Sequence, residues 1–226
     1  MNGSSPSMVI ISYNIRSRRP EDRQFLAKIG DIIRTSHADI ACLQGVVQRF
    51  GHMGRLFGQS KWLGERLGMG FVYQANESIV SGNLLLTKYK VLNTNAYSIT
   101  IGGLLEALLS TPVGLLSVFC TQWSDDADVR IKQASETAEI LNSCPNARIL
   151  CGDLGEPESG QAVRKLIDEA GLVDLMALGG CNLPTFPSSA PNIRRDYILG
   201  AGSFSVAEAR VVDSQVTDHK PVVVRV

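Results

Sequence analysis

Polar side chains that can carry out acid–base or metal chemistry stand where apolar, strand-like runs of the sequence begin or end. They are Asn14, Asp153, Asp196 and the neighbouring pair Asp218 and His219. Sheet proteins often build their sites in this way, because rigid strands deliver side chains to one mouth. Carboxylates, an amide and an imidazole suit a hard cation such as Mg²⁺ with a general acid or base. Zinc, which prefers Cys and His, fits this set poorly.

Each of these residues taken alone also has a purely structural explanation. Asn and Asp at strand ends commonly form Asx-turns, and Asp218 could cap a turn before the last strand. A lone histidine such as His219 is more often a surface or hydrogen-bonded residue than a catalyst. The group as a whole, and no single member, favours a functional site.

The elements that must position these residues are short apolar runs alternating with amphipathic, helix-like stretches. Strands are expected over residues 8–12, 39–43, 70–74, 83–87, 91–101, 104–111, 115–120, 147–151, 196–199, 206–212 and 221–226. Helices are expected over residues 23–36, 56–67, 129–141 and 159–170. No linker or repeat interrupts this pattern, so we expect a flexible tail over residues 1–7 and one domain over residues 8–226, with mixed sheets and helices packed outside.

Composition narrows the class of protein. The chain has 226 residues, and its 44% apolar and 19% charged content excludes global disorder. Lys plus Arg and Asp plus Glu both number 22, so no global field favours nucleic acid or an anionic membrane. No apolar run is long enough to span a membrane. The five cysteines are odd in number and lack zinc-ligand spacing, which favours free thiols in a reducing, cytoplasmic location.

Seven segments of the chain, taken in order, resemble motifs of the endonuclease/exonuclease/phosphatase superfamily, the DNase I-like metal-dependent phosphoesterases. The segments are ISYNI (11–15), DIACLQGV (39–46), GNLLLT (82–87), residues 116–123, LCGDLG (150–155), TFP (185–187) with RRDYI (194–198), and TDHKPV (217–222). The resemblance implies an α/β fold, a four-layer α/β/β/α sandwich of two packed mixed sheets.

The resemblance also implies roles for individual residues. Asp153 would orient or deprotonate the attacking water, and His219, oriented by Asp196, would contact the scissile phosphate. Asn14 would lie in the metal and phosphate site and act in catalysis, and Asp218 would help to hold the cation. The predicted cofactor is Mg²⁺ or Mn²⁺, held by Asp218, Asn14 and Asp153. Substrate contacts are predicted for Asn83, Arg16 and Arg194.

Three positions depart from the family pattern. Gly45 stands where the family has its metal-ligand Glu, Gln122 replaces the His of its T-H-L motif, and Gly155 replaces the Asn of G-D-F-N. Mg²⁺ is therefore expected to bind weakly. Gln44 is a poor substitute, because its side chain points to the opposite face if the strand continues. Glu156 could supply a carboxylate, although a solvated loop acid is the more ordinary interpretation.

Two hypotheses remain open from the sequence. The first is a divergent, metal-dependent phosphoester hydrolase: a phosphodiesterase, nuclease or phosphatase. The second is a catalytically impaired member that binds a phosphate ligand, a nucleic acid or a protein; arginines after Asn14 and before Asp196 favour it, namely Arg16, Arg18, Arg19, Arg23, Arg194 and Arg195. The retained carboxylates and His219 favour the enzyme. The expected partner is a phosphorylated small molecule or a nucleic-acid end, with no obligate protein partner.

Overall fold

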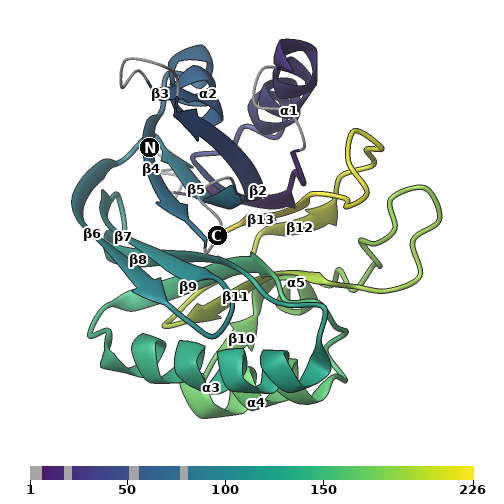
Figure 1. The fold of residues 1–226 in the computed structure, drawn as a ribbon. Coiled ribbons are helices and arrows are strands. Elements are labelled where there is room, and N and C mark those ends of the chain that lie inside the picture. The colour runs from purple at the N-terminus through teal and green to yellow at the C-terminus, as the bar shows by residue number, and fades with distance from the viewer. Residues whose placement is uncertain (1–6, 18–21, 51–55, 77–80) are drawn as a thin grey trace.

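The structure is a computed structural model that describes residues 7–17, 22–50, 56–76 and 81–226. Two sheets lie face to face, with α1 and α2 outside one of them and α3 and α4 outside the other (Figure 1). The four-layer α/β/β/α sandwich predicted from the sequence is confirmed. The predicted tail over residues 1–7 lies, except for Ser7, outside the described residues, and the single-domain assignment of residues 8–226 stays a prediction.

The first sheet has the strand order β12-β13-β1-β2-β5-β4, and β3 pairs with β2. Its strands in the described part of the chain are β1 (Val9–Asn14), β2 (Ile40–Phe50), β3 (Leu56–Gly58), β4 (Gly70–Ala75), β5 (Ser81–Thr87), β12 (Glu208–Val211) and β13 (Val222–Arg225). β1 lies at the centre, parallel to β2 and antiparallel to β13. In the middle of this sheet, the first described strand therefore pairs with the last.

The second sheet has the strand order β10-β11-β9-β8-β7-β6. Its strands are β6 (Lys90–Ser98), β7 (Gly103–Thr111), β8 (Gly114–Gln122), β9 (Ala147–Asp153), β10 (Val173–Asp174) and β11 (Asp196–Ala201). β7 and β8 form the hairpin that the sequence predicts. β11 runs antiparallel to β9 and pairs Asp196 with Asp153, so two predicted site residues share one edge of the sheet.

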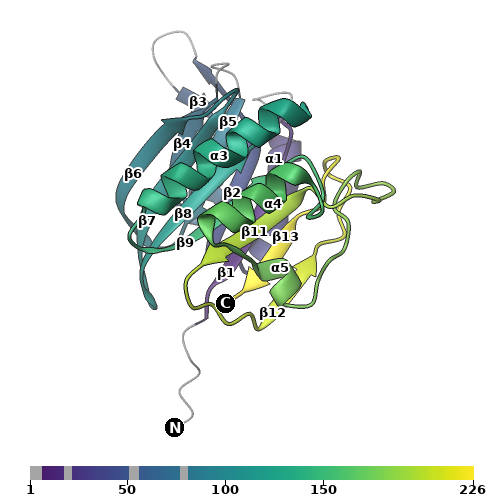
Figure 2. The ribbon, with the colours of Figure 1, turned by 90° about the horizontal axis from the view of Figure 1, so that it is seen from below.

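Helices cover the outer faces of both sheets. They are α1 (Arg23–Thr35), α2 (Gln59–Leu67), α3 (Ala127–Ser143), α4 (Gln161–Ala170) and the short α5 (Leu175–Leu178). Figure 2 shows α3 and α4 side by side across the second sheet. The helix predicted over residues 56–67 begins three residues later than expected, because residues 56–58 pair with β2 as β3. It ends, as predicted, at Gly68, which has φ of 64°.

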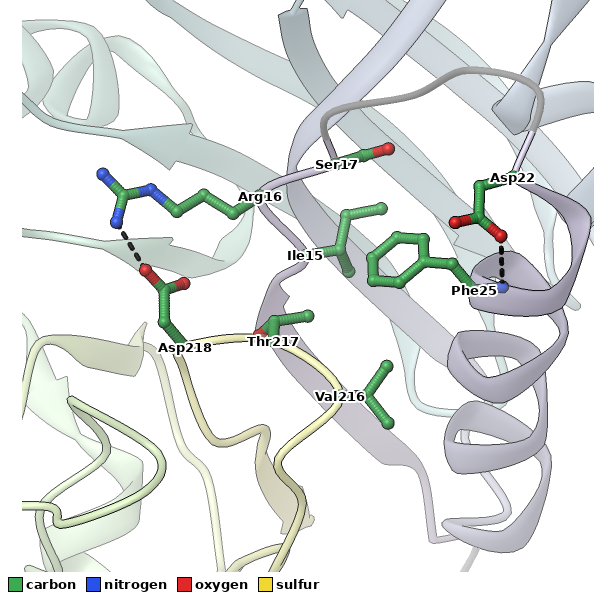
Figure 3. A pocket seen from close by; sticks show the side chains of 8 residues that line it. All are labelled: Ile15, Arg16, Ser17, Asp22, Phe25, Val216, Thr217 and Asp218. Carbon is green, nitrogen blue, oxygen red and sulfur yellow. Dashed lines mark hydrogen bonds and ion pairs between the residues drawn. The ribbon is translucent and has the colours of Figure 1, made fainter.

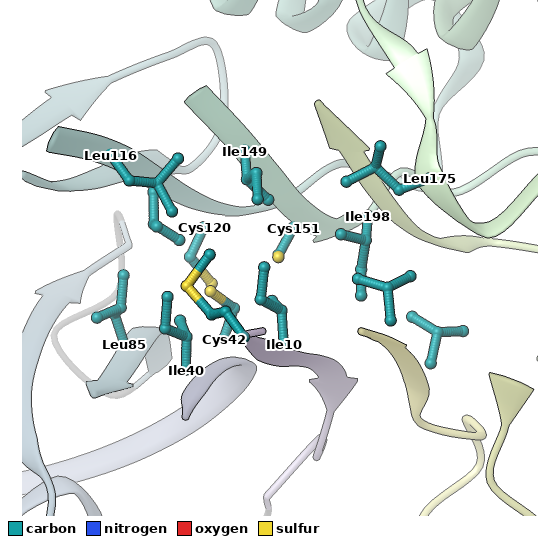
Figure 4. Packing of buried hydrophobic residues seen from close by; sticks show 14 of the residues in the cluster. Ile10, Ile40, Cys42, Leu85, Leu116, Cys120, Ile149, Cys151, Leu175 and Ile198 are labelled. Carbon is teal, nitrogen blue, oxygen red and sulfur yellow. The ribbon is translucent and has the colours of Figure 1, made fainter. Parts of the chain in front are cut away.

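The core alternates along the strands with a period of two. Ile10, Ile40 and Cys42 face the second sheet, whereas the intervening residues, such as Ile11 and Leu43, face α1 and α2. A third apolar layer packs the second sheet against α3 and α4. Figure 4 shows Cys42, Cys120 and Cys151 in the layer between the sheets. All five cysteines are free thiols, as the sequence predicts.

Candidate active site

A buried hydrogen bond joins the two sheets at the mouth of the sandwich. Asn14, the last residue of β1, donates from Nδ2 to Oδ2 of Asp153, the last residue of β9, over 2.8 Å. The other carboxylate oxygen of Asp153 accepts from the Gly155 amide (3.1 Å) and from Nε of Arg195 (3.2 Å). Both Asn14 and Asp153 are almost wholly buried. Asp153 is therefore fixed by donors on both of its oxygens.

His219 lies beside this pair and is oriented by Asp196. Its Nδ1 lies 2.9 Å from Oδ2 and 3.1 Å from Oδ1 of Asp196, so Nδ1 carries a proton toward the carboxylate. Its Nε2 then faces Oδ2 of Asp153 at 3.6 Å. The hydroxyl of Thr185 donates to Asp196 over 2.6 Å, and the Phe186 ring packs against the imidazole. The geometry is that of an oriented acid–base histidine.

The surroundings shift the pKa of both acid–base groups upward. Burial and the nearby charge of Asp196 raise the pKa of Asp153, against the opposing pull of His219, Arg195 and Asn14. Burial alone would lower the pKa of His219, but Asp196, Asp153 and Asp218 together hold it above its ordinary value. Such perturbed pKa values in a cleft are typical of groups that transfer protons.

Arg195 contacts the Asp153 carboxylate from the side of the second sheet. Arg195 binds Asp153 through Nε and donates from Nη2 to Asp125 over 2.7 Å. Its guanidinium also stacks over the Phe186 ring, 4.9 Å from the centroid. The hydrogen bond from Arg195 lowers the pKa of Asp125, and the charge of Arg16 contributes to the same shift. Two arginines, Arg16 just after β1 and Arg195 just before β11, therefore approach this mouth.

Arg16 closes the mouth on the side of the first sheet. Its amide donates to Oδ1 of Asn14 (3.0 Å), and its Nη1 donates to Oδ2 of Asp218 over 2.5 Å. About half of its side chain remains exposed. Figure 3 shows the guanidinium reaching Asp218 beside a cavity of about 380 Å³, which Ile15, Phe25 and Thr217 help to line. Of the other arginines predicted near Asn14, Arg18 and Arg19 lie outside the described residues.

A second cavity, of about 520 Å³, opens where β8 ends. Gln122, Trp123 and Ser124 form one wall, and Asn76, Ser81 and residues 101–102 complete it. Because β8 is parallel to β9 and pairs Gln122 with Asp153, this cavity lies beside the end of β9 that carries Asp153. Gln122, which replaces the expected His, therefore lies at the wall of a neighbouring cavity.

Two predicted substrate-binding residues are not brought to this cluster. Arg194 is buried, pairs with Asp174, donates to Asn182 (2.9 Å) and stacks on the Tyr197 ring. Of the two neighbouring arginines that the sequence analysis names, Arg195 is the one that contacts Asp153. Asn83 is buried and donates to the carbonyl of Gly103 over 2.9 Å and to Asn76.

Supporting residues that the sequence reasoning missed come from the loops. Asp125 anchors Arg195, while Thr185 and Phe186 hold Asp196 and His219 in place. Thr185 and Phe186 belong to the TFP segment at residues 185–187, a matched motif that could have indicated their role. Asp125 carried no signal, because its role depends on a contact with Arg195, seventy residues away.

The position expected to hold a metal-ligand Glu is closed by the backbone. Gly45 has φ of +67°, and a Cβ there would lie 2.9 Å from both N and Cα of Arg16. The chain approaches this closely because Ile15 and Ser17 donate from their amides to the carbonyls of Gln44 and Gly45. Gln44 points between the sheets, toward Ser12 and Cys120, as its strand position predicts.

Glu156 does not reach the site either. It is buried, forms an ion pair with Arg130 over 3.1 Å, and accepts from the amides of Ala162 and Val163 at the start of α4. The interpretation of Glu156 as a solvated loop acid was therefore wrong, because the carboxylate satisfies the free amides of a helix that has no capping side chain at Gly160. Gly155 has φ of +77°, and a Cβ there would press on Arg130.

The remaining donors fit a divalent cation poorly. Asp153, Asp196 and His219 lie close enough together to hold a metal ion, with ligand atoms within 4.8 Å of one another. These atoms, however, already bind Asn14, Arg195, Thr185 or each other. The other oxygens predicted as ligands, on Asn14 and Asp218, accept hydrogen bonds from Arg16. Protein cations and amides thus bind most of the oxygens that a metal would need; among those named, Oδ1 of Asp218 is buried without a partner in the described part of the chain.

The chain belongs to the Endonuclease/Exonuclease/phosphatase family, whose family model matches residues 11–219. It is similar to a family protein from Bacteroides thetaiotaomicron (TM-score 0.78, 18% identity, 97% of each chain covered). It is also similar to a mannosyl-6-phosphatase from Bacteroides thetaiotaomicron VPI-5482 (TM-score 0.76, 16% identity, 97% of this chain and 99% of that chain). The human Nocturnin catalytic domain with bound sulfate gives a TM-score of 0.78 at 17% identity, covering 98% and 94%.

These identities are low, so the similar structures establish the shared fold alone. No curated protein matches the chain. Within the described residues, no helix is long and apolar enough to cross a membrane.

Proposed function

We propose that this protein is a phosphoester hydrolase whose acid–base machinery is Asp153 with the His219–Asp196 pair. The observation that carries the proposal is the buried array in which Asn14 binds Asp153, Asp153 faces His219, and His219 binds Asp196. Polar residues that only formed turns at separate strand ends would not be expected to form one continuous chain of contacts. Members of this family are generally hydrolases that act on phosphoesters.

The array can divide the reaction between its residues. Asp153, with its raised pKa, accepts a proton from the attacking water as the new O–P bond forms. His219 stabilises the phosphoryl oxygens and gives its Nε2 proton to the leaving oxygen as the ester bond breaks. Asp196 holds the imidazole and stabilises its charged form. Asn14 keeps Asp153 in place throughout.

Mg²⁺ or Mn²⁺ was predicted from the resemblance, and family members typically use a divalent cation. In this chain the closed position at Gly45 and the hydrogen bonds of Arg16 argue against a well-formed metal site, so no step is assigned to a metal. The same features favour the second candidate, a phosphate-binding module without turnover. Retention of the whole acid–base array favours the hydrolase.

The proposed substrate is a phosphorylated small molecule or a nucleic-acid end. The zero net charge gives no support to long-duplex binding. Two cavities, of about 380 Å³ beside Arg16 and Asp218 and of about 520 Å³ beside Gln122, suit a compact substituent. The similarity to a mannosyl-6-phosphatase, and to a Nocturnin catalytic domain that binds a sulfate anion, supports the same broad class. The free buried thiols support the proposed cytoplasmic location.

The test is hydrolysis of a generic chromogenic phosphodiester and phosphomonoester by the purified protein, with Mg²⁺, with Mn²⁺ and in excess chelator. His219→Ala should lower turnover by roughly 10²–10⁴-fold. The matched control is His37→Asn, because His37 is exposed and Asn tolerates its φ of 55°. Equal activity in wild type and His219→Ala, or no turnover of a panel of phosphoesters, would leave the binding module as the better explanation.

A further inference from the structure

We propose that Arg16 supplies, through its guanidinium, the positive charge at the phosphate side of this site, so that the protein binds a phosphoryl group without a divalent cation. This inference rests on the proposed function, because it concerns the same site. The positive charge that binds the phosphoryl group would thus come from an arginine side chain and not from a bound metal ion.

The first observation is the path of the backbone. Residues 15–17 run beside Gln44 and Gly45, joined by hydrogen bonds of 3.0 and 2.9 Å. Position 45 can therefore carry no side chain without displacing the backbone of Arg16, which lies 2.9 Å from where its Cβ would be. The segment that closes this position is also the segment that brings a guanidinium to the mouth.

The second observation is that Arg16 binds one oxygen of Asn14 and one of Asp218 on this side, while Oδ1 of Asp218 is buried without a partner among the described residues. The Arg16 amide binds Oδ1 of Asn14, and its Nη1 binds Oδ2 of Asp218. One residue thus contacts both of the predicted metal ligands of the first sheet. A cation that binds Oδ1 of Asn14 or Oδ2 of Asp218 would have to displace a hydrogen bond of Arg16.

The third observation is the unused capacity of the guanidinium. Arginine has five N–H donors in a planar fork that matches phosphate oxygens. Among the described residues, the hydrogen bonds of the Arg16 side chain involve Nη1, while about half of the side chain is exposed. It can keep Asp218 on one edge and present Nε and Nη2 to a phosphoryl group on the other.

Arg195 completes the arrangement from the second sheet. It is held by Asp153 and Asp125, and the charge of Arg16 also acts on Asp125. Each guanidinium is thus held by carboxylates of this mouth, Arg16 by Asp218 and Arg195 by Asp153 and Asp125. A phosphoryl group placed there would meet two fixed positive charges next to His219.

The experiment measures the binding of inorganic phosphate by calorimetry, with excess chelator and again with Mg²⁺. Wild type should bind equally well in both conditions, and Arg16→Gln should bind about tenfold or more weakly. Arg34→Gln is the matched control, because Arg34 pairs with Asp31 on the exposed face of α1. Circular dichroism verifies that each variant is folded; Arg16→Lys, which keeps the charge, serves as a second variant.

A second readout is the binding of Mn²⁺, followed by the loss of its free-ion signal in electron paramagnetic resonance. Arg16→Gln should bind Mn²⁺ more tightly than wild type, because Asp218 loses its cation. Phosphate binding that requires Mg²⁺ in wild type, that is absent in wild type, or that survives Arg16→Gln unchanged would overturn the proposal. Turnover and its loss in His219→Ala test the hydrolase separately, so either proposal can fail alone.

Discussion

The side-chain amide of Asn14 lies 2.8 Å from a carboxylate oxygen of Asp153, although the two residues are 139 positions apart in the sequence and belong to different sheets. This bond connects the mouth of the first sheet to that of the second. It also uses the two ends of the Asn14 amide for different purposes, since Oδ1 accepts from the Arg16 backbone. Asn14 therefore links the proton-transfer side of the site to its arginine side.

Replacing Asn14 should weaken the fold and the site together. Asn14→Ala leaves a buried Asp153 oxygen and the Arg16 amide without their partner, so we expect a loss of about 1–3 kcal/mol in the free energy of unfolding. Urea denaturation measures it. Asn142→Ala, which removes an exposed bond to Glu169, should change stability by less than about 0.5 kcal/mol. Equal effects of the two substitutions would contradict the buried role of Asn14.

The raised pKa of His219 predicts how stability depends on pH. Because the folded pKa lies above the ordinary value of 6.5, the imidazolium contributes stability that is complete below about pH 6.5. That contribution is lost as the pH rises through the folded pKa. The difference in unfolding free energy between wild type and His219→Asn should therefore shrink from pH 6 to pH 9. A difference that grows with pH would show the opposite shift.

Asp196 should control the same titration. Asp196→Asn removes the carboxylate that faces Nδ1, so NMR titration should find the pKa of His219 lower than in wild type. Asp213→Asn, at an exposed carboxylate paired with Lys220, is the control and should leave the His219 titration in place. An unchanged His219 pKa in Asp196→Asn would mean that another group orients the imidazole.

Gly45 should tolerate no side chain. Gly45→Ala combines the positive φ with the close approach of Arg16, so we expect a loss of about 1–3 kcal/mol in stability. Gly68 has nearly the same φ but nothing within 4 Å of its added Cβ, so Gly68→Ala isolates the backbone strain. Thermal and urea unfolding should find Gly45→Ala the more destabilised. Equal losses of stability would mean that the Arg16 backbone moves aside without lowering the free energy of unfolding.

Glu156 should behave as a structural residue. Glu156→Gln weakens the buried pair with Arg130 and should cost about 2 kcal/mol in stability. Phosphate binding should change little, because the carboxylate faces α4 and not Asp153. The neighbouring exposed Glu158→Gln is the matched control and should be neutral. A selective loss of phosphate or Mn²⁺ binding in Glu156→Gln would reinstate it as a site residue.

The positions of the array residues are predictable because each adjoins a short, continuous apolar run. Asn14, Asp153 and Asp196 all lie at strand termini, which the limits of such runs locate within a residue or two. The apolar runs do not tell whether Arg194 or Arg195 contacts Asp153. Both precede β11 in a loop, where no periodicity tells which side chain turns inward.

The remaining differences depend on contacts between distant parts of the chain. The φ of Gly45 follows from a backbone pairing with residues 15–17, and no local pattern encodes it. The elements β10 and α5 are too short, at two and four residues, to leave a periodic trace. Glu156 could have been recognised as a cap, since an acidic residue a few positions before a helix commonly meets its free amides.

The central pairing of β1 with β13 has a consequence for the order of folding. Asn14 and Arg16 meet Thr217 and Asp218 across more than 200 residues of chain. Such closure is slow, since the entropy of ordering the intervening chain is lost before these contacts form. A nascent chain truncated before residue 217 would hold Asn14 and Asp153 but lack His219, Asp218 and the last central strand. Copies of the chain in which this pairing has not yet formed therefore lack a complete candidate site.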